Sequence, residues 1–179
     1  LDSFIKKGTY PPINEDLALR HFNHLITETD KQGFVHYEIS NFGKPNYFSK
    51  HNTSYWQGKP YLGIGPSAHS FNGKERSWNV ANNTKYIQAI NSGNLPSTAE
   101  TLSDRDRFNE YVMTGLRTIW GISLQNIERD FGAAYHEQLL KSVHPYIKKQ
   151  LLEIRDENII ATQKGKFLID GIASDLFMI

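Results

Sequence analysis

The sequence of 179 residues predicts an α+β (α/β) fold whose character changes along the chain. In the first half, an amphipathic helical pattern runs directly into an alternating strand pattern, as in an α/β unit. In the last third, three helical segments precede a hairpin, an order that suggests a small winged-helix-like bundle. A hydrophobic content of 39% suffices for a real core.

Periodicity and turn residues define the elements of the first half. Asn14 is a good N-cap ahead of apolar residues at helical spacing, and Gly33 ends that pattern. Apolar and polar residues then alternate as in a strand, and Asn72-Gly73 is a hairpin turn signal. The expected elements are a helix over 14–32, a strand over 34–40, a long ordered loop over 41–60, a short strand over 61–65 and a strand near 77–80.

Capping residues define the second half. Asn83 can cap a short connecting helix that stops at Gly93, and Ser103 with Asp106 fits a capping box. Ser123 can cap the helix after that. The expected elements are a helix from 103 to about 121, a short helix over 123–132, a long helix over about 137–156, a hairpin of 159–161 and 167–169 around a Lys164-Gly165 turn, and a last helical turn or two within 171–178.

Composition narrows the possible functions. Lys and Arg total 20 against 19 Asp and Glu, so no overall field favours nucleic acid or an anionic membrane. The absence of cysteine excludes disulfides, thiolate metal sites and a cysteine-ligated iron–sulfur cluster within these residues. No apolar run approaches the roughly 20 residues of a membrane span. The chain begins at Leu1 without a visible signal peptide, and we expect a processed or truncated start.

The densest group of reactive side chains is His51-Asn52-Thr53-Ser54-Tyr55-Trp56. A loop histidine can ligate iron or hydrogen-bond a carboxylate, and neighbouring Tyr and Trp can cover a flat apolar ring, so this group would suit a tetrapyrrole. The alternative is structural: Tyr55 and Trp56 would anchor the segment to the core, and His51 would satisfy a buried carbonyl. The residues alone leave both interpretations open.

Two further features carry similar alternatives. The glycines of Gly63-Ile64-Gly65-Pro66-Ser67-Ala68-His69-Ser70 would let backbone approach a ligand closely, or would simply form a tight turn. Glu38 projects from the polar face of its strand. It would point at a ligand in a barrel, whereas in an ordinary sheet it would lie at the solvent side or pair with a neighbouring Lys or Arg.

Read in order, three motifs resemble one family. They are Tyr37-Glu38-Ile39-Ser40-Asn41-Phe42, then His51-Asn52 with Tyr55-Trp56 (HNxxYW), then the glycine segment ending in Ala68-His69-Ser70. Together they are similar to HemW-type haem chaperones, relatives of the oxygen-independent coproporphyrinogen III oxidases in the radical S-adenosylmethionine (SAM) family. The resemblance continues to Asp170 and covers essentially the whole chain.

This resemblance implies a domain organisation. Family members have a radical SAM β/α barrel whose cysteine motif holds a [4Fe-4S] cluster, followed by a helical domain of the HemN carboxy-terminal type. By analogy, residues 1–79 would be the end of the barrel with the HNxxYW segment, 80–101 a connector and 102–179 the appended domain. The chain would then be a carboxy-terminal fragment that lacks the cluster ligands.

The resemblance also implies site residues. Gly63, Gly65, Ala68 and His69 would lie on the SAM side. His51 would be a possible haem iron ligand, with Asn52, Tyr55 and Trp56 around the haem. Glu38 would face the barrel interior. No residue of the chain is expected to hold the [4Fe-4S] cluster.

The expected function of the intact protein is to bind haem and deliver it to acceptor proteins in haem and porphyrin metabolism. An alternative function is oxidative decarboxylation of coproporphyrinogen III to protoporphyrinogen IX. A less favoured alternative is a winged-helix nucleic-acid-binding module, and the near-neutral net charge argues against it. We expect a cytoplasmic protein that does not insert into membranes, and a fragment inactive by itself that associates through the exposed edge of its half-barrel.

Overall fold

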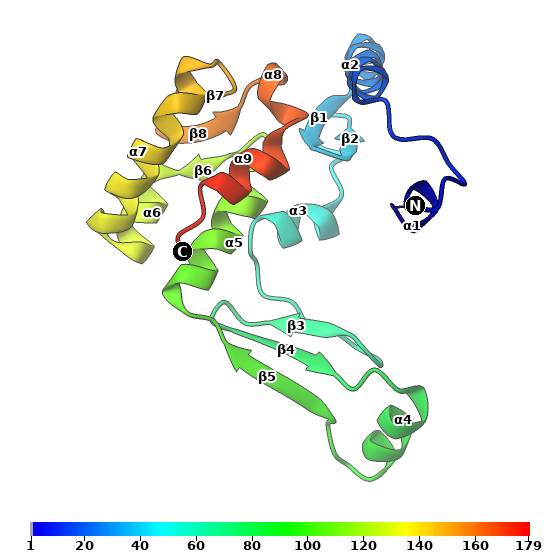
Figure 1. Ribbon diagram of the computed structural model, residues 1–179. Coiled ribbons are helices and arrows are strands. Elements are labelled where there is room, and N and C mark those ends of the chain that lie inside the picture. The colour runs from blue at the N-terminus through cyan, green and yellow to red at the C-terminus, as the bar shows by residue number, and fades with distance from the viewer. Residues whose placement is uncertain (1) are drawn as a thin grey trace. The chain divides into compact units, whose positions relative to one another are not determined.

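The computed structural model describes residues 2–179 and divides the chain into two compact units, residues 1–47 and 48–179 (Figure 1). Each unit is described by itself. In the described part of the chain, no helix is long and apolar enough to cross a membrane.

The first unit holds two helices and a small hairpin. Helices α1 (Asp2–Lys6) and α2 (Glu15–Lys31) precede strands β1 (Val35–Glu38) and β2 (Asn41–Gly43), which pair antiparallel. Asn14 caps α2 as predicted, accepting a hydrogen bond from the Leu17 backbone N–H at 2.9 Å. The expected strand is confirmed in β1, but the expected loop over 41–60 is wrong at its start because β2 folds back onto β1.

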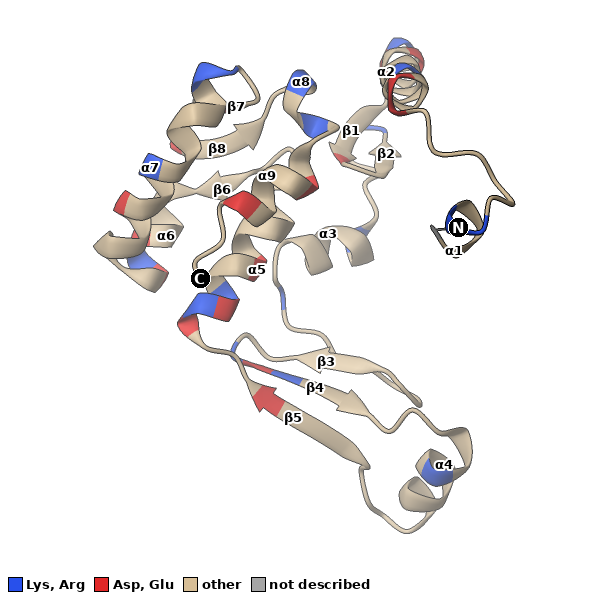
Figure 2. Ribbon diagram, in the orientation of Figure 1, with Lys and Arg blue, Asp and Glu red and all other residues tan. Residues whose placement is uncertain are grey.

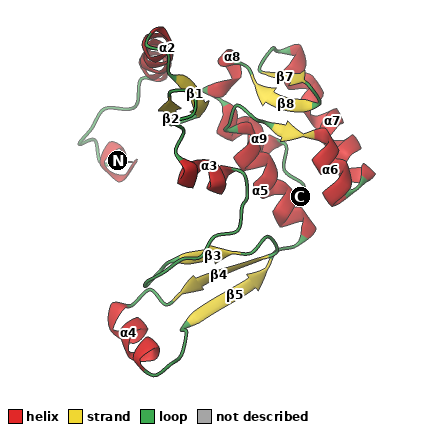
Figure 3. Ribbon diagram, turned by 180° about the vertical axis from the view of Figure 1, so that it is seen from behind, coloured by secondary structure: helices red, strands yellow, loops and turns green. Residues whose placement is uncertain are grey.

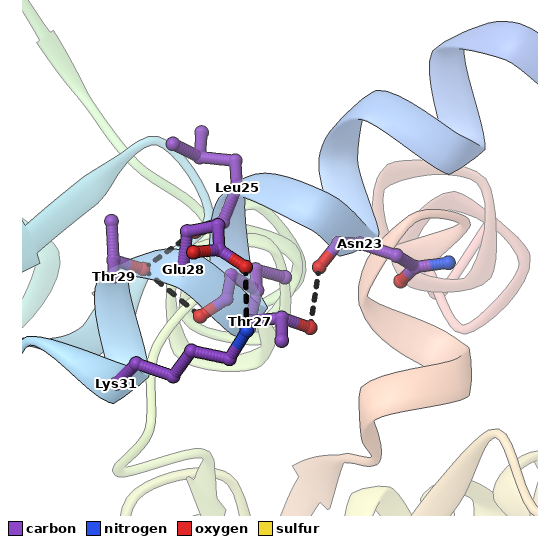
Figure 4. A network of polar contacts seen from close by, with 7 residues as sticks. Asn23, Leu25, Thr27, Glu28, Thr29 and Lys31 are labelled. Carbon is purple, nitrogen blue, oxygen red and sulfur yellow. Dashed lines mark hydrogen bonds and ion pairs between the residues drawn. The ribbon is translucent and has the colours of Figure 1, made fainter.

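Helix α2 is stabilised largely by bonds within itself. It has no buried residue, although its sequence is amphipathic. In Figure 4 the hydroxyls of Thr27 and Thr29 donate to carbonyls one turn back, at 2.9 Å to Asn23 and 2.8 Å to Leu25. Lys31 Nζ lies 2.7 Å from a carboxylate oxygen of Glu28 and lowers the pKa of that carboxyl. On the apolar face of α2, the Phe22 ring meets the His36 ring of β1 edge-on at 5.7 Å, so this helix also packs on the hairpin.

The second unit begins with a helix where the sequence predicts a loop. Helix α3 (Lys50–Trp56) carries the HNxxYW motif, and the Ser49 hydroxyl caps it by accepting from the Asn52 N–H at 3.3 Å. The loop prediction for 41–60 is thus wrong here too. The motif has no apolar periodicity of a helix, because its ring side chains stand at His51, Tyr55 and Trp56. The capping residue is therefore the only local signal for this helix.

A three-stranded antiparallel sheet follows α3, in the order β3–β4–β5. Its strands are β3 (His69–Phe71), β4 (Glu75–Asn79) and β5 (Ser97–Thr101), and helix α4 (Asn83–Asn91) lies between β4 and β5. The turn at Asn72-Gly73 is confirmed, with Gly73 at φ +99°. The segment expected as a connector, 80–101, thus contains a helix and a full strand of this sheet.

The predicted strand over 61–65 does not form. Tyr61 makes one isolated antiparallel bridge to Phe71, and the chain then leaves the sheet. Leu62 and Ile64 are 78% and 85% exposed, so no neighbouring strand or core face holds them. Gly65, at φ +105°, turns the chain away from an extended path.

Residues 104–175 form the expected winged-helix-like bundle, in which helices surround a sheet of order β6–β8–β7 (Figure 3). The capping box of Ser103 and Asp106 at the start of the first helix, and the Ser123 cap, are both confirmed. The elements are α5 (Asp104–Leu116), β6 (Ile122–Ser123), α6 (Leu124–Phe131), α7 (Ala133–Lys148), β7 (Leu152–Arg155), β8 (Asn158–Ala161), α8 (Gln163–Lys166) and α9 (Ile169–Asp175).

The carboxy-terminal hairpin lies earlier in the chain than predicted. Helix α7 ends at Lys148 because Gln150 adopts φ +58°, and the residues expected as its last turns form β7 instead. Asp156 and Glu157, both at positive φ, make the turn to β8. The predicted strand at 167–169 and the turn at Lys164-Gly165 are wrong, because these residues lie in or beside α8 and α9. Gly165 is needed for close packing, since a Cβ there would lie 1.9 Å from the Leu151 carbonyl oxygen.

The hydrophobic core lies almost wholly within the winged-helix-like domain. Of the described buried apolar residues, Tyr37 alone lies outside it. The core side chains of the domain are Phe108, Val112, Leu116, Ile122, Ile127, Leu139, Val143, Leu151, Leu152, Ile159, Ile169, Ile172, Ala173 and Leu176. This part of the chain therefore has the core of an independent domain, whereas residues 1–101 do not.

Candidate functional site

Helix α3 is anchored to the winged-helix-like domain by aromatic contacts. The guanidinium of Arg117 lies 5.2 Å from the centre of the Trp56 ring, and Arg117 is itself 2.5 Å from a carboxylate oxygen of Asp170. Just before α3, the ring of Phe48 meets the ring of Trp120 edge-on at 6.3 Å. These contacts support the structural interpretation for Trp56, because a cation over an indole face fixes the ring in place.

The other motif residues on α3 remain accessible. His51 is exposed, Asn52 is half-buried and Tyr55 is 50% exposed. His51 and Tyr55 are four residues apart and therefore lie on one face of the helix. The structural alternative for His51, satisfaction of a buried carbonyl, does not agree with its exposure. Its imidazole is accessible to a ligand.

Tyr55 and Trp56 also line an open cavity of about 770 Å³ within the second unit. The Tyr55 ring contacts Trp56 edge-on at 5.6 Å and Tyr61 at 5.7 Å, and Tyr61 lies 6.2 Å from Phe71. Burial raises the pKa of the Tyr61 hydroxyl, so that it stays protonated. Half of the HNxxYW motif thus forms an aromatic wall together with Tyr61 and the β3 strand.

The glycine segment is held by its neighbours as well as by its own turn, in which the Ala68 N–H donates to the Gly65 carbonyl at 3.3 Å. A Cβ at Gly63 would lie 2.1 Å from the His69 carbonyl oxygen, so only glycine fits there. Asn79, 5% exposed, donates from Nδ2 to the Gly65 carbonyl at 2.9 Å and reaches the Gly63 carbonyl at 3.4 Å. The Gly65 N–H in turn lies 3.3 Å from the Tyr86 hydroxyl.

The residues expected to contact SAM differ in their surroundings. Gly65 meets open space at the position of a Cβ, so its backbone can be approached by a ligand. Gly63 cannot serve in the same way because the backbone of His69 already occupies that position. Ala68 is half-buried, with its carbonyl accepting from the Asn79 N–H at 3.0 Å. His69 is exposed on β3, and its ring lies 6.2 Å from that of Trp78.

Glu38 lies in the first unit and is 1% exposed, so the solvent-side expectation for an ordinary sheet is wrong. Its Oε2 accepts from the Ser40 N–H at 3.0 Å and from Asn41 Nδ2 at 2.5 Å. Beside it, the His36 ring stacks on Phe42 with centroids 4.4 Å apart. The carboxylate is removed from water because the tight β1–β2 turn supplies its hydrogen bonds.

Sequence reasoning missed the residues that hold these segments in place. The sequence patterns assigned no such role to Tyr61, Arg76, Asn79, Tyr86 or Arg117. Each acts through a partner far away in sequence, as Asn79 does on Gly65. No local periodicity or spacing signals such a contact.

The chain has no cysteine to ligate an iron–sulfur cluster. Among residues 2–179, no group of three or more His, Cys, Asp or Glu side chains is placed to hold a metal ion.

Comparison with known proteins agrees with this architecture. Residues 102–168 match the HemN C-terminal domain. The chain is 29% identical over 176 residues to the heme chaperone HemW of Lactococcus lactis, covering 93% of this chain and 46% of that protein. It is 26% identical over 173 residues to HemW of Mycobacterium tuberculosis, covering 96% and 42%.

One solved structure has a similar fold. Coproporphyrinogen III oxidase (HemN) from Escherichia coli, described as a radical SAM enzyme, superimposes with a TM-score of 0.64 at 21% identity, over 87% of this chain and 40% of that one. Among the residues described here, no closed barrel is present.

Residues 102–168, which match the HemN C-terminal domain, thus lie in the winged-helix-like bundle around the β6–β8–β7 sheet. Over most of its length the chain is similar to part of the HemW heme chaperones, and residues 102–168 match the HemN C-terminal domain. It spans less than half the length of the two HemW relatives.

Proposed function

We propose that the intact protein binds haem through helix α3 and delivers it to acceptor proteins. The observation that carries this proposal is the presentation of the HNxxYW motif. Trp56 is fixed under Arg117, while His51 and Tyr55 stay accessible on one face of the helix. The proteins of L. lactis and M. tuberculosis that are named heme chaperones support the same function.

The residues of α3 would have separate roles. His51 would supply a neutral imidazole nitrogen to the haem iron, as histidine does in many haem proteins. Tyr55 would pack against the macrocycle with its hydroxyl towards water, because a phenol combines an apolar ring with a polar tip. Asn52 lies one turn before Trp56 and can hydrogen-bond at the edge of the ligand.

In the intact protein, the glycine segment would form part of the SAM-binding site. Gly65, Ala68 and His69 are the candidates for contact, because the backbone at Gly65 is open and His69 is exposed. Gly63 would act by allowing the segment to pack on β3. SAM bound to a reduced [4Fe-4S] cluster supplies a 5′-deoxyadenosyl radical. The thiolates for that cluster must come from outside this chain, so these residues alone are expected to leave SAM intact.

A haemin titration tests the proposal. The intact protein is titrated with haemin, and the Soret band is followed for the native sequence, for His51→Ala and for His144→Ala. His144 is an exposed control on α7. We expect stoichiometric binding that His51→Ala weakens or shifts and His144→Ala leaves unchanged. If all three titrations coincide, His51 does not handle haem, and oxidation of coproporphyrinogen III becomes the better hypothesis.

The first 101 residues would depend on the rest of the barrel. Exposed apolar side chains concentrate there, and they include Ile13 at 63%, Leu25 at 49% and Ile87 at 57%. Without further barrel strands, such surfaces favour association between copies. We expect residues 1–179 alone to show concentration-dependent association in sedimentation velocity, which a single monomeric species at all concentrations would contradict.

A further inference from the structure

The cavity beside α3 has walls that are rich in aromatic side chains. Its volume of about 770 Å³ lies within the range of small-molecule and cofactor sites. α3, β3 and the segment between them supply some of these rings, and α5, α6 and the carboxy-terminal tail supply the others. The aromatic lining residues are Tyr55, Trp56, Tyr61, Phe71, Tyr111, Phe131 and Phe177.

The rings from α5 and α6 are held in defined positions. The Tyr111 hydroxyl accepts hydrogen bonds from the Ser123 N–H at 3.1 Å and from Asn126 Nδ2 at 3.3 Å. Phe131 lies 6.4 Å from Tyr111, with the two rings inclined by 35°. Preorganised rings of this kind favour a flat apolar ligand that can stack or pack edge-on against them.

Cations lie at the edge of the same aromatic walls. The guanidinium of Arg107 lies 5.5 Å from the centre of the Phe131 ring and pairs at 3.0 Å with the exposed carboxylate of Asp104. Arg76 pairs with Glu110 across the cavity lining. Burial acts to lower the pKa of Arg76, but the bond to Glu110 outweighs it and raises that pKa. Arg76 therefore stays charged.

Arg107 is not saturated by its pair with Asp104. A guanidinium has five N–H donors in a fork that matches a carboxylate. Arg107 contacts Asp104 through one nitrogen, Nη1, at the exposed side. The carboxylates of Asp106 and Asp130 line the same cavity, and the charge of Arg107 acts on Asp130. A ligand carboxylate beside Phe131 would therefore compete with Asp130 for the remaining donors of Arg107.

The carboxy-terminal tail completes the cavity. The Asn109 side chain forms two hydrogen bonds with the backbone of Met178, donating to its carbonyl at 3.0 Å and accepting from its N–H at 2.8 Å. This pair of hydrogen bonds fixes the backbone at Met178 against α5. Asn109 is thus the positioning residue that keeps Phe177 in the cavity wall.

We propose that this cavity is a seat for the porphyrin macrocycle itself, in which aromatic rings hold the flat face and Arg107 binds a carboxylate side chain, independently of iron. The inference rests on the proposed haem function and names the part of the protein that recognises the organic ring. His51 and Tyr55 share one face of α3. Iron ligation and ring contact would therefore come from successive turns of one helix.

Metal-free protoporphyrin IX and its dimethyl ester test the seat separately from the iron. Their binding to the intact protein is followed by porphyrin fluorescence for the native sequence, Arg107→Gln and the control Arg105→Gln. Arg105 is exposed on the same helix and does not line the cavity. Arg107→Gln is expected to weaken binding of the free acid about 10- to 100-fold, as for a lost hydrogen bond to a charged group, and to leave the ester unchanged. Arg105→Gln should leave both unchanged.

Phe177→Ala tests the apolar wall. It is expected to weaken the free acid and the ester alike, by about 10-fold, because one ring contact is removed from each. Unfolding by urea, compared with the native protein, shows whether the variant is folded. Unchanged protoporphyrin IX binding in folded Arg107→Gln and Phe177→Ala would overturn the seat, even where haemin binding still depends on His51. Conversely, if these variants behave as expected while His51→Ala leaves haemin binding unchanged, the seat stands and iron ligation by His51 fails.

Discussion

Truncation of Phe108 measures the core on which the carboxy-terminal domain depends. Phe108 is fully buried, and its ring lies 5.6 Å from Phe131 and 5.0 Å from Tyr135. Phe108→Ala removes a whole ring from a close-packed site, which costs about 3–5 kcal/mol in comparable cores. Domains of this size are stable by about 5–15 kcal/mol in total. The substitution should therefore remove a large fraction of the free energy of unfolding.

Urea denaturation followed by far-ultraviolet circular dichroism gives this free energy. The transition midpoint of Phe108→Ala should fall while its denaturant slope is unchanged, which indicates lost stability rather than a changed unfolded state. Phe167→Ala is the matched control, because Phe167 is already 37% exposed and should lose only about 1–2 kcal/mol. A loss below about 1 kcal/mol for Phe108→Ala, or one equal to that of the control, would refute the placement of this core.

Four further results are expected. Residues 102–179 expressed alone should unfold cooperatively, because they contain their own core, whereas residues 1–101 alone should give no such transition by calorimetry. Ser103→Ala should lower the free energy of unfolding in urea by about 0.5–2 kcal/mol, because it removes the cap of α5. An unchanged transition midpoint would show that the cap is dispensable. The hydrogen bond from Ser103 lowers the pKa of the Asp106 carboxyl below its usual 3.8, so the stabilisation by this carboxylate is present above that pH and is lost as the pH falls through the lowered pKa. The difference in free energy of unfolding between the native protein and Asp106→Asn should therefore disappear below pH 3.8. A difference that persists there would contradict this. Gly63→Ala should lower the free energy of unfolding by about 1–3 kcal/mol, because its Cβ meets the His69 backbone. Gly171→Ala in α9, where nothing lies within 4 Å, should be neutral or stabilising. Thermal unfolding measures both variants.

Local signals predicted the elements whose ends are set by nearby residues. The Asn14 cap, the capping box before α5 and the Asn72-Gly73 turn each act within four residues, and each is confirmed. Elements that depend on distant partners were missed. All residues of β5 (Ser97–Thr101) are exposed, so the strand has no alternating pattern, and it exists because β4 pairs with it.

The same reasoning explains the errors at α7. Leu151 and Leu152 continue an apolar helical spacing, so the pattern alone extends the helix. The chain instead adopts a left-handed conformation at Gln150, and both leucines become buried beside the hairpin. Burial of a side chain by tertiary contacts outweighs the periodicity of the local sequence.

The HNxxYW group and the glycine segment are the candidates that the sequence offers, and they stay predictions. In the structure His51 is exposed, and Gly65 has open space at the position of a Cβ. Its supporting contacts join residues that are far apart in sequence, such as Arg76 with Glu110 and Asn109 with Met178. Sequence spacing carries no information on such pairs.

Both charge signs are interspersed along α5 and α7 (Figure 2), as the net charge of +1 suggests. A nucleic-acid surface needs a continuous basic stripe, and its binding falls steeply with salt. The distribution of charge therefore gives no support to the winged-helix domain as a nucleic-acid module.

The axial ligand of bound haem tests the central claim most directly. Resonance Raman and electron paramagnetic resonance spectra of the intact protein with haemin can be recorded for the native sequence and for His51→Gly, with and without added imidazole. A histidine-ligated spectrum that is lost in His51→Gly and restored by imidazole would establish ligation through α3. Identical spectra for both proteins, unaffected by imidazole, would contradict it.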